Sequence, residues 1–168
     1  MERWCELEGV VVAITELEAP FSGIRCVLYQ AALGPLQRLL EGSGGASRET
    51  AGVRFLLRTH GAWGTGLVLV DAGAAEEVEL RRRTRRRCRL GADRACDQRL
   101  RALYGRLARV GPARRSVSGV EARLETGEHL ELVGTLTTCP DPRGLPAGYR
   151  EPPRLPLLRA QALRVRSA

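Results

Sequence analysis

An apolar residue at every second position is the feature that most constrains the fold of this chain. The pattern appears in six segments before residue 140, namely 9–15, 24–29, 53–59, 66–70, 120–125 and 129–136. Alternation with period two is typical of strands that bury one face. A barrel closes such strands without leaving free edges. The sequence therefore predicts a mainly β (α+β) fold, a small OB-like β-barrel of about six strands.

One segment shows helical spacing instead. Leu100, Leu103 and Leu107 form an apolar stripe within residues 93–110, Asp93 can cap the start, and a Gly-Pro pair ends the segment at 111–112. We expect one amphipathic helix, packed on the β layer between the fourth and fifth candidate strands. That placement is the one found in OB-like folds.

Glycines mark two features of the later strands. Gly127 lies in the short connection 125–129, where we expect a hairpin turn with positive φ. Gly134 interrupts the alternation in segment 129–136 and predicts a bulge or a close backbone approach. The carboxylates Glu121, Glu125 and Glu131 fall on the polar phase of their strands, so we expect them on a solvated face.

The length suits one domain. A chain of 168 residues can bury a core without disulfides, and the five cysteines are scattered and odd in number. We expect a single domain over 1–160, with a flexible insertion at 30–50, an arginine-rich segment at 80–92, a proline-rich strap after Gly134, and a last strand or tail that includes 161–168. Reduced thiols, no leader-like N-terminus and no long apolar stretch predict a cytoplasmic protein, with peripheral membrane association as a further option.

The charge is strongly basic. The net charge is +8, and all 27 basic residues are arginine, a bias that a GC-rich genome would also produce. A basic protein suits a polyanion partner such as nucleic acid or an anionic membrane surface. The candidate contact residues are the seven arginines of 81–89: Arg81, Arg82, Arg83, Arg85, Arg86, Arg87 and Arg89. The competing interpretation is a solvated strand end and loop. No aromatic residue interrupts the run, which disfavours base stacking and makes nucleic acid the weaker alternative.

Catalytic and metal-binding patterns are weak. No Cys-x-x-Cys pair is present, and His60 and His129 stand apart, so we expect no metal and no cofactor. Cys26 follows a Pro-Phe-Ser-Gly turn and could be a nucleophile, but its phase between Ile24 and Leu28 predicts an inward-facing core residue. An enzyme that uses Cys26 or Cys139 with a histidine remains an alternative.

Several segments together resemble one family. The segments "GVVVA" and "APFSGIRCVLY", then "GTGLVLVDAGAAEEV", "VEARLETGEHLELVGTL" and "YREPPRLPLL" follow the order of motifs in the GIDE or BAM ("beside a membrane") domain. This domain occurs in membrane-anchored RING E3 ubiquitin ligases and in bacterial proteins. The similarity extends from about residue 9 to residue 158. The residues that carry it, expected to be structural, are Gly9, Pro20, Ser22, Gly23, Cys26, Tyr29, Gly66, Asp71, Glu121, Gly127, Gly134, Tyr149 and Pro152.

The resemblance implies a recognition role without catalysis. In the ligases the catalytic part is a Cys/His-rich RING, and this sequence contains neither a RING ligand set nor a spanning helix. The resemblance therefore implies an accessory domain that binds another protein or a membrane-proximal partner. A polyanion-binding OB-like module and the Cys/His enzyme are the two alternatives from other classes.

Overall fold

The computed structural model describes residues 2–33, 47–59, 66–73, 75–80, 82–89, 98–99, 102–103, 116–143 and 154–166. Within these ranges the chain is mainly β, which confirms the predicted fold class. The strands are β1 (Arg3–Ala13), β2 (Leu17–Glu18), β3 (Arg25–Cys26), β4 (Leu28–Leu33), β5 (Ser47–Gly52), β6 (Phe55–Thr59), β7 (Gly66–Asp71), β8 (Glu77–Glu79), β9 (Arg82–Arg89), β10 (Ser116–Leu124), β11 (His129–Pro140) and β12 (Arg154–Val165).

The chain groups into two compact units built from interleaved segments. Unit 1 comprises residues 1–16, 52–79 and 125–168, and unit 2 comprises 17–51 and 80–124. Each unit thus draws its strands from stretches far apart in the sequence. This division into contact units does not test whether residues 1–160 form one domain. The expectation of one domain over 1–160 therefore stays a prediction.

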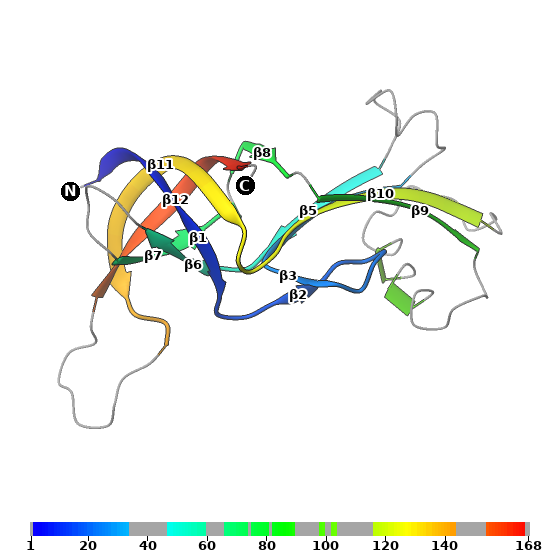
Figure 1. The fold of residues 1–168 in the computed structure, drawn as a ribbon, viewed down its shortest axis with the longest axis horizontal. Helices are drawn as coiled ribbons and strands as arrows, with labels where there is room; N and C mark the ends of the chain where they lie inside the picture. Colours follow the sequence, from blue (N-terminus) through cyan, green and yellow to red (C-terminus); the bar gives the residue numbers. More distant parts are fainter. Residues whose placement is uncertain are drawn as a thin grey trace. The chain divides into compact units, whose positions relative to one another are not determined.

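Unit 1 contains a small β-barrel, as predicted (Figure 1), but two of the six candidate strands, 24–29 and 120–125, fall in unit 2 almost entirely and take no part in it. Its strands follow the order β11-β1-β6-β7-β12, and β11 also pairs with β12, which closes the sheet on itself. β8 adds to β12 in parallel. The interior is apolar, and its completely buried side chains include Val11, Phe55, Leu57, Val70, Leu130 and Leu158. Each such side chain contributes roughly 1.5–3 kcal/mol by leaving water.

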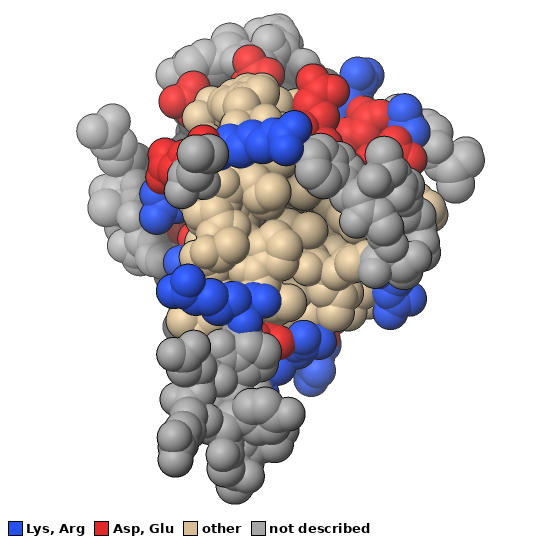
Figure 2. Space-filling view, turned by 90° about the vertical axis from the view of Figure 1, so that its left-hand side faces the viewer, with Lys and Arg blue, Asp and Glu red and all other residues tan. Residues whose placement is uncertain are grey.

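A second apolar cluster lies on the outer side of the barrel wall. Leu56, Leu69 and Leu157 alternate with the inward-facing residues and pack against partly buried neighbours such as Val12 and Leu155. Figure 2 shows that one face of the molecule carries a broad uncharged area with both basic and acidic side chains along its borders. No helix in the described ranges has the length and apolar character needed to cross a bilayer.

The glycine predictions in unit 1 are confirmed. The register of β11 and β12 shifts between Val133 and Gly134, so a bulge lies at this glycine. A Cβ at Gly134 would collide with the carbonyl oxygen of Arg159, so the close approach is present as well. Gly127 has φ of +90°. Its turn is no hairpin, however, because β10 pairs with β4 and β9, whereas β11 pairs with β1 and β12.

Two segment boundaries also need correction. The interval 30–50 was expected as an insertion, but residues 30–33 belong to β4 and residues 47–50 to β5; positions 34–46 lie outside the described residues. For the end of the chain a last strand and a tail were both open, with 161–168 bounded as a tail; residues 161–165 continue β12, and this strand pairs with β11. Most of the proline-rich strap, 144–153, lies outside the described part of the chain.

Unit 2 contains a four-stranded sheet of order β5-β4-β10-β9 and the short ribbon β2-β3. A core of Phe21, Cys26, Tyr29, Leu33 and Leu103, with alanines between them, is buried in this unit. Leu103 belongs to the predicted apolar stripe, and residues 98–99 and 102–103 are helical. The helical segment therefore packs on the β layer, as expected; the rest of 93–110 lies outside the described residues.

Candidate binding site

A buried carboxylate fixes the turn that precedes β3. Glu121 on β10 is completely buried and accepts hydrogen bonds from the Phe21 backbone N–H at 2.6 Å and the Ser22 hydroxyl at 2.5 Å. The Ser22 backbone N–H lies 3.3 Å from the same carboxylate. Hydrogen bonds to a charged acceptor are the stronger kind. Glu121 therefore anchors residues 21–22 to a strand about 100 residues away in the sequence.

Two glycines make room for this turn. At Gly119, two residues before Glu121, a Cβ would overlap the ring of Phe21, so only glycine admits the phenyl group against β10. Gly23 has φ of +70°, and a Cβ there would come within 3.0 Å of the Arg99 guanidinium. Glycine adopts positive φ without steric cost. The Pro-Phe-Ser-Gly sequence is thus explained as a turn built to fit β10.

The expectation for Glu121 was wrong. We placed Glu121 on a solvated face with Glu125 and Glu131, because all three alternate with apolar residues. In β10 the polar phase faces the core, where Arg123 forms an ion pair with Glu121 at 3.4 Å and is only 8% exposed. Glu125 and Glu131 are half-buried. The available signal was the Glu-x-Arg spacing, which puts opposite charges on one face of a strand.

The expectation for Cys26 is confirmed. Its side chain is 0% exposed, as is that of Val27, while Ile24 is 39% exposed. Ile24 was expected to face inward with Cys26 and Leu28. The alternation fails because the strand is interrupted at Val27, whose N–H donates to the Leu124 carbonyl at 2.9 Å before β4 begins. Tyr29 is buried and donates its hydroxyl to Glu49 at 2.6 Å.

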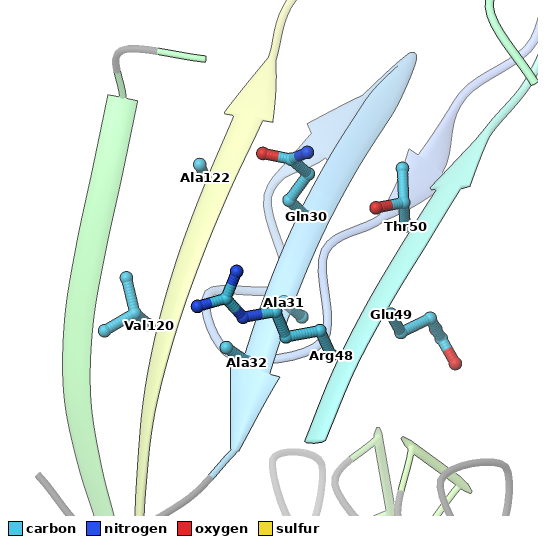
Figure 3. A pocket seen from close by; sticks show the side chains of 8 residues that line it. All are labelled: Gln30, Ala31, Ala32, Arg48, Glu49, Thr50, Val120 and Ala122. Carbon is cyan, nitrogen blue, oxygen red and sulfur yellow. The ribbon is translucent and has the colours of Figure 1, made fainter. Parts of the chain in front are cut away.

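The opposite face of the four-stranded sheet carries a shallow hollow of about 200 Å³. It is lined by side chains of β4, β5 and β10 (Figure 3), among them Gln30, Ala32, Arg48, Thr50, Val120 and Ala122. Figure 3 shows the Arg48 side chain extending from β5 over β4 toward β10, whereas Glu49 points away from the hollow. The hollow thus combines one cation with a floor of small apolar groups.

The arginine-rich segment forms strand β9 at one end of this sheet. β9 spans Arg82–Arg89 and pairs antiparallel with β10, with Arg85 opposite Val120 and Arg83 opposite Ala122. Six of its eight residues are arginine. In the described part of the chain, β10 is the one partner of β9, so β9 is an edge strand. Arg81 lies outside the described residues.

The other residues of the resemblance lie mostly in unit 1. A Cβ at Gly9 would collide with the Arg58 carbonyl oxygen. Glycine is therefore required at this position, because β6 approaches β1 closely there. Asp71 ends β7 and forms an ion pair with Arg54 at 2.9 Å. Gly66 begins β7 beside Thr59. Pro20 is buried in the turn before β3. Tyr149 and Pro152 lie outside the described residues.

The described residues assemble no catalytic dyad around Cys139. His129 and Cys139 lie ten residues apart on β11, which at about 3.3 Å per residue is roughly 30 Å. His60 lies outside the described residues. Burial raises the pKa of the Cys5 thiol, an effect that the nearby Arg3 partly opposes. In the ranges that the structure covers, no three His, Cys, Asp or Glu side chains gather as metal ligands.

No family model, no curated protein and no solved structure matches this chain.

Proposed function

We propose that this protein is a non-catalytic recognition module that binds a partner protein by adding an acidic, extended segment of that partner to the edge strand β9. The observation that carries the proposal is the position of β9 at the end of a sheet. A partner protein is also what the resemblance to the GIDE or BAM domain implies.

The backbone of β9 supplies the first part of the interaction. In an antiparallel pair the N–H and C=O groups of alternate residues point to opposite sides of the strand. About half of those groups in β9 therefore point away from β10. An extended peptide can bond to them as an additional strand, a recurring mode of peptide recognition.

The arginines supply the second part. An edge strand with six arginines in eight residues repels basic segments and attracts acidic ones. Charged residues also protect edge strands from unwanted pairing. An acidic partner segment is attracted by the arginines of β9. It also neutralises the positive charge that keeps other strands from pairing with this edge.

The experiment compares acidic peptides that differ only in their backbone donors. A labelled eight-residue peptide that alternates glutamate and threonine is titrated with the full chain and followed by fluorescence anisotropy. The same peptide N-methylated at every residue keeps its charges and has no backbone N–H. We expect the N-methylated peptide to bind at least about ten-fold more weakly, since strand addition depends on backbone hydrogen bonds.

The matched variants separate the effect of positive charge on β9 from the effect of the arginine side-chain shape. Changing Arg82, Arg83, Arg85 and Arg86 to glutamate should abolish binding, while changing the same four to lysine should retain most of it. Heparin and single-stranded oligo(dT) serve as competing polyanions. Equal binding of both peptides, together with tighter binding of either polyanion, would overturn the proposal in favour of a polyanion-binding module.

A further inference from the structure

The hollow on the sheet of unit 2 combines features that suit a specific small group. It lies on the face opposite the core, because Gln30 and Ala32 alternate with the buried residues Tyr29, Ala31 and Leu33 along β4. Core packing on the other face holds these strands in place.

The floor of the hollow is apolar and built from small residues. Ala32, Val120 and Ala122 leave a depression where larger side chains would have filled it. Its volume of about 200 Å³ is below the 300–1,000 Å³ of typical small-molecule sites and equals the space of roughly six to seven waters. A group the size of one side chain fits this space.

Polar groups lie around the floor. The Arg48 guanidinium extends over β4 toward Val120, and the Gln30 amide lies above the same strand (Figure 3). The Thr50 hydroxyl is on β5 beside them. A guanidinium has five N–H donors in a planar fork that matches a carboxylate in two-point contact, so it can serve more than one acceptor.

We propose that this hollow binds a carboxylate carried on a short aliphatic stem, with the carboxylate on Arg48 and the stem against Ala32, Val120 and Ala122. Two sources carry this chemistry, the side chain of a glutamate in another protein and a free small dicarboxylate. A phosphate would match the guanidinium equally well but has no stem to cover the floor. The apolar floor therefore favours a carboxylate.

This inference does not require strand addition to β9, although Arg83 and Arg85 of that strand pair with the floor residues Ala122 and Val120. All residues that line the hollow belong to β4, β5 and β10, and none belongs to β9. The acidic residue nearest by sequence, Glu49, is directed to the other face, where it accepts the Tyr29 hydroxyl hydrogen bond. The hollow can therefore bind its ligand even if no peptide pairs with β9.

The test is a titration of the full chain followed by NMR of the Gln30 side-chain amide and the methyl groups of Ala32, Ala122 and Val120. The probes are acetate, glutarate, N-acetylglutamate methylamide and inorganic phosphate, all at one ionic strength. We expect saturable shifts with glutarate or with the glutamate derivative, and weaker binding of acetate and phosphate. The tighter of the two stem-bearing probes identifies the source.

Three variants sharpen the result. Arg48→Gln should weaken binding roughly ten- to a hundred-fold, because it removes a charged hydrogen-bond donor. Ala122→Leu should block the floor and abolish the preference for a stem. Arg54→Gln is the matched control, since Arg54 lies in unit 1 and pairs with Asp71, and should change nothing. Phosphate binding as tightly as glutarate, or no effect of Arg48→Gln, would overturn the inference.

Discussion

Replacing Glu121 by alanine should destabilise unit 2 more than other carboxylate substitutions in this chain. The change removes the acceptor for the Phe21 N–H at 2.6 Å and for the Ser22 hydroxyl at 2.5 Å. It also removes the ionic partner of Arg123, which is only 8% exposed. Each hydrogen bond to a buried charge contributes about 1.5–3 kcal/mol, and breaking a buried pair costs about 3–5 kcal/mol.

These magnitudes set the expected loss at about 3–5 kcal/mol, a large part of the roughly 5–15 kcal/mol that stabilises a typical domain. Glu121→Gln keeps one acceptor oxygen and should lose about half as much. Glu18→Ala is the control, because Glu18 is exposed on the ribbon β2-β3, and it should stay within about 0.5 kcal/mol.

Urea unfolding followed by far-UV circular dichroism measures the free energies of unfolding. Amide hydrogen exchange of β4 and β10 then assigns the loss to unit 2. A loss below about 1 kcal/mol for Glu121→Ala would refute the reasoning, since a buried charge pair cannot be removed at so small a cost.

Three further predictions concern close packing and thiol chemistry. Gly119→Ala should destabilise unit 2 by about 1–3 kcal/mol in urea unfolding, because its Cβ would overlap the Phe21 ring; full stability would show that the ring can move aside. Gly134→Ala should likewise lower barrel stability, since the Arg159 carbonyl oxygen occupies the space, while Gly66→Ala, whose nearest atom lies at 3.8 Å, should have a much smaller effect. Cys5 should react with iodoacetamide more slowly than free cysteine at neutral pH, because burial raises the pKa of the Cys5 thiol and lowers its thiolate fraction; peptide mapping by mass spectrometry measures the rate, and a rate equal to that of free cysteine would contradict the burial.

Strand β11 could be predicted from local sequence because its first residues alternate between buried and more exposed positions. In β11, Leu130 and Leu132 are buried, whereas His129 is exposed and Glu131 half-buried, and Gly134 is placed where the register shifts. Patterns of this kind survive because a slip of one residue would turn the apolar set outward.

The pairing of strands was not available from local sequence. β12 pairs in parallel with β7 and β8, and β10 and β11, although consecutive, join different sheets. β9 has no alternation of apolar and polar residues, so its sequence contains no signal for a strand. Such elements depend on contacts between distant segments.

The buried polar site was missed for a related reason. Alternation shows that Glu121 and Ala122 face opposite sides of β10, but it does not show which side meets the core. In this strand the charged phase lies toward the Phe21 turn and the apolar phase lines the hollow. A carboxylate placed inward is favourable here because three polar groups of the turn lie around it.

Amide hydrogen exchange of β9 tests the central claim most directly. The full chain is measured with and without the acidic eight-residue peptide at saturation. Strand addition predicts slower exchange at alternate residues of Arg82–Arg89, those whose N–H groups point away from β10, with the amides of β11 unchanged. Saturable peptide binding that leaves every β9 amide exchanging at its original rate would contradict the account.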